Sequence, residues 1–143
     1  MNRDEIRTLF KLKQIKNTKQ RLCVYGILLS ADQPMTAEAI YLALSGSDAD
    51  AQRLNLSTVY RILDLFVKED LVVRNSFSKD YKATYEVATQ THKHHLICVK
   101  CHHVTVIEGC PLEKYEKTLV KSTHFQIIEH KLEIHGICPK CQN

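Results

Sequence analysis

The most reactive side chains of this sequence gather in residues 91–101, THKHHLICVKC, which hold three histidines and two cysteines. A second cysteine pair with the same C-x2-C spacing lies near the end of the chain. Each pair can bind one metal ion from a tight turn, and two pairs complete a tetrahedral S4 shell that suits Zn²⁺. Four protein ligands leave no open coordination position. The spacing therefore predicts a structural zinc site formed by Cys98, Cys101, Cys138 and Cys141.

The histidines indicate a second kind of site. Alternate residues of a strand share a face, so His92 and His94 are predicted to point one way and His95 the other. A His-x-His pair is a common metal pincer. His130 also has an ordinary explanation as a hydrogen-bonded core residue, and Glu113 as an acid favoured by the dipole of a helix N-terminus. From the residues alone, both interpretations stay open.

Length and composition limit the class of protein. The chain has 143 residues, enough for one ordinary domain or two small ones, and 44% hydrophobic and 25% charged residues, as globular proteins have. Apolar runs are short, and residues 1–10 contain no apolar signal core. We therefore expect no membrane span, no export and a cytoplasmic location. In that setting thiols stay reduced, and C-x2-C pairs bind metal rather than form disulfides.

The charge is unevenly distributed. The net charge is only +4, but seven Lys or Arg residues lie between Arg3 and Arg21, against two acids. A local basic segment is compatible with phosphate contacts, and a solvated helix face explains it equally well.

Residues 1–87 are predicted to be mostly helical. Apolar residues at helical spacing predict a helix over 20–31, which Pro34 ends, and a second helix capped by Thr36. A third helix, capped by Ser57, follows a polar loop at 45–55. Two strands, within 71–77 and 82–87, are predicted around a turn at residues 78–80. Three helices and a hairpin predict a winged helix-turn-helix.

The third helix of this unit is the candidate recognition helix. Its apolar stripe is predicted to face inward, which leaves Thr58 and Arg61 on the opposite face and Tyr60 at the edge. Short helices with such residues near the N-terminus can reach base edges and phosphates in a major groove. A surface helix whose polar side meets only water is an equally good account of the pattern.

Residues 88–143 are predicted to contain both strands and a helix, in contrast to the mostly helical residues 1–87. Residues 95–107 predict two short strands around a cysteine turn, and Cys110-Pro111 predicts the start of a helix with an apolar stripe of Leu112, Tyr115 and Leu119. The alternation of side chains between two faces predicts one strand over residues 125–138. The fold class is therefore α+β, with an N-terminal winged helix and a small C-terminal α/β unit.

The chain resembles the Fur family of metal-dependent repressors over nearly its whole length. SLSTVYRILDLFVKEDLV is similar to the family's recognition helix and wing, HKHHLICVKC to its histidine-rich strand, and EHKLEIHGICPKC to its closing strand. IEGCPLEK is similar to the zinc-uptake-regulator (Zur) branch. The resemblance implies a DNA-binding domain at 1–87 and a dimerisation domain at 88–143.

The resemblance also implies metal sites. The cysteine tetrad matches the family's structural zinc site, and its site in the dimerisation domain falls on His92, His94, Glu113 and His130. A possible further regulatory site at the hinge falls on Glu86 and His95 but is incomplete, because other family ligands are replaced here. The spare donors for it are His102, His103, Glu108, Cys110 and His124, and the remaining thiol, Cys23, is predicted to pack within its helix.

The function implied is repression of zinc-uptake genes by a zinc-loaded homodimer on a palindromic operator in double-stranded DNA. No small-molecule substrate is expected. The predicted DNA contacts are Lys16, Arg21, Ser57, Thr58, Tyr60 and Arg61, with Arg21 also suited to bracing the fold. An iron or peroxide sensor of the same family is the alternative. A zinc hydrolase or deaminase is disfavoured, since no H-E-x-x-H occurs and no H-x-E precedes P-C-x-x-C. A zinc-ribbon adaptor that binds only protein is a third interpretation.

Overall fold

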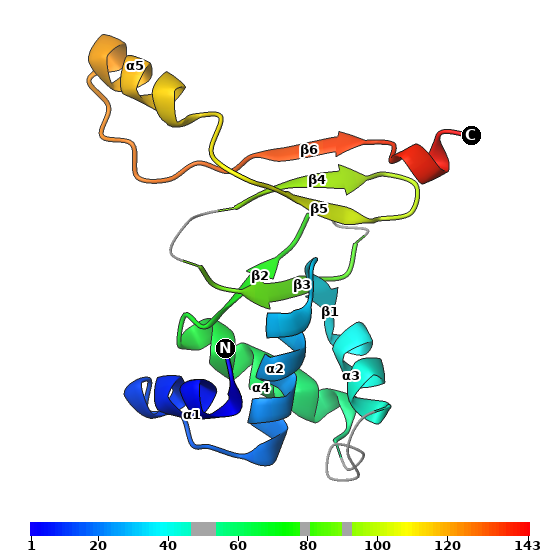
Figure 1. Ribbon diagram of the computed structural model, residues 1–143. Coiled ribbons are helices and arrows are strands. Elements are labelled where there is room, and N and C mark those ends of the chain that lie inside the picture. The colour runs from blue at the N-terminus through cyan, green and yellow to red at the C-terminus, as the bar shows by residue number, and fades with distance from the viewer. Residues whose placement is uncertain (47–53, 78–80, 90–92) are drawn as a thin grey trace. The chain divides into compact units, whose positions relative to one another are not determined.

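The computed structural model describes residues 1–46, 54–77, 81–89 and 93–143. The chain forms two compact units, Met1–Ala88 and Thr89–Asn143 (Figure 1). The predicted turn at residues 78–80, most of the predicted loop at 45–55, and His92 lie outside the described residues.

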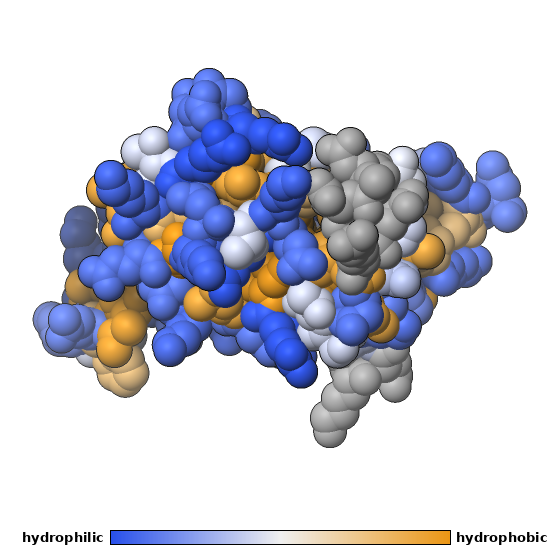
Figure 2. Space-filling model, turned by 90° about the horizontal axis from the view of Figure 1, so that it is seen from below, coloured by the Kyte–Doolittle hydropathy of each residue, from blue (hydrophilic) through white to orange (hydrophobic). Residues whose placement is uncertain are grey.

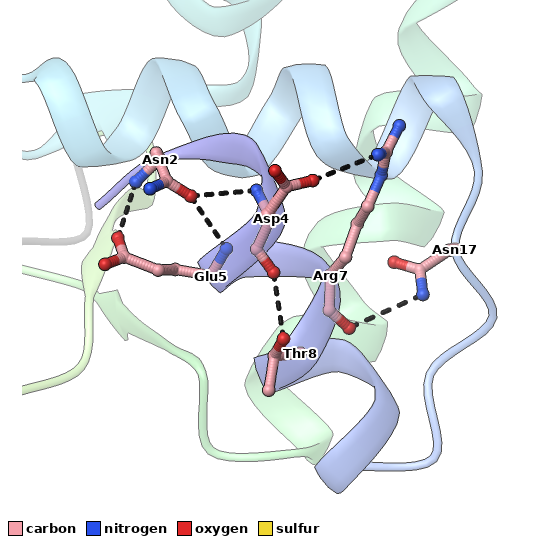
Figure 3. Close-up of polar contacts among 6 residues, drawn as sticks. All are labelled: Asn2, Asp4, Glu5, Arg7, Thr8 and Asn17. Carbon is pink, nitrogen blue, oxygen red and sulfur yellow. Dashed lines mark hydrogen bonds and ion pairs between the residues drawn. The ribbon is translucent and has the colours of Figure 1, made fainter.

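The first unit begins with a helix that the periodicity did not predict, α1 (Arg3–Leu12). Asn2 caps it by accepting hydrogen bonds from the backbone N–H groups of Asp4 and Glu5, each at 2.9 Å. The Glu5 carboxylate accepts one in return from the Asn2 N–H at 2.7 Å (Figure 3). This capping box satisfies backbone donors that the first turn leaves unpaired. The helix buries Ile6 and Phe10.

The next two helices agree with the prediction. α2 (Lys19–Ser30) is capped by Thr18 and ends before Pro34, and α3 (Ala37–Ser45) is capped by Thr36, whose hydroxyl accepts from the Ala39 N–H at 3.1 Å. Cys23 lies within α2 and packs partly buried against the core, as predicted.

The candidate recognition helix, α4 (Leu56–Lys68), begins two residues earlier than a cap at Ser57 predicts. The prediction that Ser57 caps it is wrong, because the Asn55 side chain accepts from the Thr58 N–H at 2.8 Å and Ser57 lies in the first turn. Its predicted apolar stripe is confirmed, and the buried residues are Val59, Ile62, Leu63 and Phe66.

A small antiparallel sheet completes the first unit. β2 (Val72–Asn75) and β3 (Thr84–Val87) form the predicted hairpin, and β1 (Met35–Thr36) adds a third strand in the order β1-β3-β2. The core is shared by all four helices. Phe10, Tyr25 and Phe66 pack with ring centroids 5.5–5.6 Å apart, joining α1, α2 and α4. These three rings belong to a larger core of buried, mostly aliphatic side chains from the same unit.

The second unit is built on a mixed sheet in the order β5-β4-β6. β4 (His94–Cys98) pairs antiparallel with β5 (Val104–Ile107) and parallel with β6 (Glu133–Gly136). Between β5 and β6 the chain forms α5 (Glu113–Thr123), and a 3-10 turn, η2 (Pro139–Cys141), follows β6. The parallel pairing needs a long crossover, which α5 and the segment after it supply (Figure 1).

Two expectations for this unit are wrong. The helix begins at Glu113 rather than at Cys110-Pro111, so Cys110 lies in the turn before it. The strand predicted over 125–138 forms only at Glu133–Gly136, as β6, and His130 lies before it in a segment without regular secondary structure. In a single chain α5 buries none of its residues, so the predicted stripe has no core to face.

The predicted fold class is confirmed: a helical winged-helix unit is followed by a unit with a mixed sheet. Among the described residues, no helix has the length and apolar character needed to cross a membrane.

Candidate metal centres and nucleic-acid interface

The four cysteines of the two C-x2-C pairs converge. Parallel pairing of β4 with β6 sets Cys98 opposite Gly136, so the turn after β6 returns the second pair to the first. The four Sγ atoms lie within 4.8 Å of one another, and those of Cys101 and Cys138 are 3.7 Å apart. Thiolates on a tetrahedral Zn²⁺ lie about 3.8 Å apart, given Zn–S bonds of about 2.3 Å. The geometry fits a zinc ion.

Local hydrogen bonds prepare this tetrad, Cys98, Cys101, Cys138 and Cys141, for a cation. Backbone N–H groups of Cys101 and Cys138 donate to the Cys98 sulfur, the latter at 3.3 Å, and lower the pKa of Cys98 to about 6. Interactions with the neighbouring thiols of Cys138 and Cys101 raise the pKa of Cys141 to about 12. Four thiols this close together do not all ionise without a cation, because the thiolates would repel one another. A bound zinc ion offsets that repulsion.

A second cluster joins three separate segments: His94 in β4, Cys110 before α5 and His130 before β6. The Nε2 atoms of His94 and His130 lie 3.1 Å apart, and Cys110 Sγ lies 3.4 Å and 3.3 Å from them, respectively. The two imidazole rings stack with centroids 4.9 Å apart. We call these three residues the histidine–thiol cluster.

Two acids of α5 differ in their relation to the cluster. The Glu116 carboxylate contacts His130 Nδ1, on the side of the ring away from the cluster. The predicted ligand Glu113 instead pairs with Lys117 at 3.5 Å, and its side chain is 71% exposed. The structure therefore brings together His94 and His130 from the predicted set but does not bring Glu113 to them.

The remaining predicted metal ligands stay predictions. His92 is outside the described residues, two positions before His94. Glu86 lies in β3 of the first unit and His95 in β4 of the second. Among the described residues, only the tetrad and the histidine–thiol cluster gather three or more metal-binding side chains, and of the spare donors only Cys110 takes part.

The N-terminus of α4 carries the predicted DNA contacts. Asn55 Oδ1 accepts hydrogen bonds from the hydroxyls of Ser57 and Thr58, both at 2.8 Å. The Tyr60 hydroxyl donates to Glu38 Oε1 at 3.0 Å, and Lys82 Nζ lies 3.4 Å from the same oxygen. The hydrogen bond to Glu38 raises the pKa of Tyr60. Sequence reasoning missed Glu38, because nothing local links it to a residue 22 positions away.

Three basic residues complete the predicted interface. Arg61 and Lys16 are exposed. Arg21 Nη1 donates to the Lys16 carbonyl oxygen at 2.9 Å, which matches the bracing role considered for it. The face of the molecule in Figure 2 is largely hydrophilic, with smaller apolar areas between polar side chains.

A family profile and two related proteins that match this chain are all named for ferric uptake regulation. Residues 12–135 match the profile described as "FUR: Ferric uptake regulator family". The chain is 37% identical over 129 residues to the ferric uptake regulation protein of Legionella pneumophila, covering 90% of this chain and 92% of that protein. It is 32% identical over 142 residues to the protein of the same name from Bacillus subtilis, covering 96% and 93%.

Solved structures of metal uptake regulators superpose on most of this chain. The Helicobacter pylori ferric uptake regulator, described as having three functional metal binding sites, superposes with a TM-score of 0.82 at 26% identity, covering 98% of this chain and 91% of that one. A zinc-bound manganese uptake regulator superposes with a TM-score of 0.76 at 26% identity, covering 92% and 97%. The chain belongs to the ferric uptake regulator (Fur) family of metal-responsive transcriptional regulators.

Proposed function

We propose that this chain is a zinc-responsive repressor of the Zur type, which binds a palindromic operator as a metal-loaded homodimer and controls zinc-uptake genes in the cytoplasm. The observation that carries the zinc assignment is the convergence of two imidazoles and a thiol at the histidine–thiol cluster. Imidazole and thiolate are the donors that Zn²⁺ takes in proteins, whereas Fe²⁺ and Mn²⁺ sensors can rely on harder oxygen donors.

Two kinds of zinc site are proposed. The tetrad holds structural zinc, because four thiolates close the coordination shell. The regulatory site contains His94 and His130, with His92 as a predicted ligand and a further donor from the segment that holds Cys110 and Glu113. Glu86 and His95 remain a proposed second regulatory pair.

The regulatory site links distant parts of the second unit. His94, Cys110 and His130 belong to the central strand, the segment before α5 and the segment before β6. A metal ion bound to all three restrains these segments together. We propose that this restraint selects the arrangement of the dimer in which both recognition helices match the operator. The metal can act only through its higher affinity for that arrangement.

The proposed DNA contact is the N-terminal half of α4. We propose that Arg61 pairs with guanine or phosphate, and that Tyr60 contacts a thymine methyl group or phosphate. Ser57, Thr58, Lys16 and Arg21 supply further polar contacts, chiefly with the backbone.

The proposed dimer uses the second unit. Phe125 and Ile128 are 73% and 92% exposed, and α5 buries none of its residues within one chain. A second copy of the chain would cover this apolar surface. Sedimentation of wild type against Ile128→Glu tests the dimer, with Leu12→Glu, at an exposed apolar residue of the first unit, as the matched control. A wild-type monomer would contradict it.

An iron sensor is the second candidate, because the Legionella and Bacillus relatives are named for ferric uptake regulation. It predicts operator binding that requires Fe²⁺. A peroxide sensor further predicts iron-catalysed oxidation of a ligand histidine. Operator binding with each metal distinguishes the iron sensor from zinc control, and the mass of the peptides that hold the ligand histidines reveals the oxidation.

The test joins metal counting to DNA binding. Protein loaded with zinc and washed with a mild chelator is expected to keep zinc beyond one ion per chain. An operator selected from random double-stranded DNA with zinc present is expected to bind weakly when zinc is removed from the regulatory site. Equal affinity with and without zinc would rule out the proposed function, and a requirement for Fe²⁺ would favour the second candidate.

A further inference from the structure

We propose that Cys110, rather than Glu113, supplies the third protein ligand of the regulatory site, and that Glu116 is the residue that positions His130 for the metal. This inference rests on the proposed function, since it concerns the same site. It makes a thiolate the determinant of metal selectivity.

The separations of the donor atoms support a shared metal ion. In a tetrahedral zinc site, two imidazole nitrogens lie about 3.3 Å apart and a nitrogen lies about 3.6 Å from a thiolate sulfur, given bonds of about 2.05 and 2.3 Å. The nitrogen–nitrogen distance here is 3.1 Å, and the nitrogen–sulfur distances are 3.4 and 3.3 Å. All three lie within a few tenths of an ångström of the metal-bound values.

The Glu113 carboxylate does not join the cluster of donor atoms around the two histidines. Its carboxylate is directed to Lys117 one turn along the exposed side of α5. The chain enters α5 through a turn at 110–112, which places Cys110 next to His94 and His130 before the helix begins. An acid in the first turn is favourable there because of the helix dipole, whether or not a metal is bound.

Glu116 has a different role. It contacts Nδ1 of His130, whereas Nε2 of the same ring faces the cluster. When Nδ1 carries the proton and donates it to a carboxylate, Nε2 presents its lone pair to a metal ion. Acids in this position fix the tautomer and orientation of the ring and strengthen it as a ligand. Glu116 is therefore a positioning residue that does not itself bind the ion.

A thiolate ligand has a consequence for selectivity. Replacing an oxygen donor by sulfur favours Zn²⁺ and Co²⁺ over Mn²⁺ and other ions that prefer oxygen. The site then has two nitrogen donors and one sulfur donor from the described residues.

The experiment uses the full chain with zinc in the tetrad, titrated with Co²⁺. A cobalt–thiolate bond gives a charge-transfer band in the near ultraviolet. We expect that band in wild type and its loss in Cys110→Ser, together with at least a tenfold fall in Co²⁺ affinity. Cys23→Ser, the matched control, is expected to keep both, because Cys23 lies in α2 of the first unit.

The acids are tested in parallel. Glu116→Gln is expected to weaken Co²⁺ binding roughly 10- to 100-fold while keeping the thiolate band at saturation, as loss of an outer hydrogen-bond partner does. Glu116→Asp should recover part of the affinity. Glu129→Gln, at the exposed acid beside His130, is the matched control. Zinc in the tetrad and the far-ultraviolet circular dichroism confirm that each variant is folded.

The outcomes are distinct. A thiolate band that survives in Cys110→Ser, or Co²⁺ binding lost in Glu113→Gln but kept in Cys110→Ser, overturns the ligand assignment. Equal affinities for Glu116→Gln and Glu129→Gln overturn the positioning role. If the thiolate band is present in wild type and lost in Cys110→Ser while operator affinity is the same with and without zinc, the ligand assignment stands and the proposed function is wrong.

Discussion

The Tyr60 hydroxyl donates a hydrogen bond of 3.0 Å to Glu38, which ties the candidate recognition helix to α3. The same carboxylate oxygen lies 3.4 Å from Lys82 Nζ, in the segment between the strands of the hairpin. One acid therefore connects three parts of the predicted DNA-binding surface. A change at Glu38 should affect both stability and the orientation of Tyr60.

This contact predicts a pH dependence of stability. The backbone N–H of Glu38 first, and then Tyr60 and Lys82, lower the pKa of Glu38 below its ordinary 4.5. A carboxyl group with a lowered folded-state pKa stabilises the protein fully above its unfolded pKa and loses that effect as pH falls through the folded value. The stability difference between wild type and Glu38→Gln should therefore be constant above about pH 5 and shrink below pH 4.5. Urea unfolding of both proteins across this range measures it, and a difference that grows on acidification would contradict the assignment.

The cap of α4 is a second target. Asn55 accepts from the Thr58 N–H and from two hydroxyls of the first turn. Asn55→Ala is expected to cost about 1 kcal/mol of stability, because the first turn loses its cap. Asn55→Ser retains a capping oxygen and should cost much less. Equal losses in the two variants, measured by urea unfolding, would mean that the cap contributes little.

Arg61 should separate DNA binding from metal binding. Arg61→Ala is expected to cost about 1–3 kcal/mol of operator affinity if the guanidinium pairs with guanine. Zinc content and unfolding midpoint should stay unchanged, because the side chain is exposed. Lys68→Ala, at the other end of α4, is the matched control for loss of one positive charge. Unchanged operator binding in Arg61→Ala would contradict the predicted contact, and a wild-type protein that binds no operator at all would favour the adaptor that binds only protein.

The tetrad should hold the second unit together. Cys138→Ser removes one thiolate and is expected to release the structural zinc, whose binding energy is part of the folding energy of that unit. Hydrogen exchange should then lose protection in β4, β5 and β6 and retain it in α2 and α4. Cys23→Ser provides the control for cysteine removal. Full protection of the sheet in Cys138→Ser would show that zinc is dispensable for this unit.

Much of the structure follows from local patterns in the sequence. The apolar stripes of α2, α3 and α4 recur at helical spacing, and each stripe packs into the core of the first unit. The tetrad was predicted because each C-x2-C pair is a complete bidentate unit within four residues. Local signals also misled: Asn55 and Ser57 can both cap a helix, and only the backbone conformation decides between them.

The histidine–thiol cluster depended on tertiary structure. His94, Cys110 and His130 are separated by 16 and 20 positions, and no local spacing links them. Their meeting requires β4 in the centre of the sheet and a turn that ends before Glu113. The alternation of side chains along a strand predicted the face on which His94 lies. It could not show whether Cys110 or Glu113 lies nearer to the histidines, because the distance between remote residues is not a local property of the sequence. The family, the helical core and the tetrad could be predicted from the residues alone, because each is carried by patterns within short segments. Which donors converge beside His130 is visible only in the folded chain, because their meeting depends on how the chain crosses between β5 and β6.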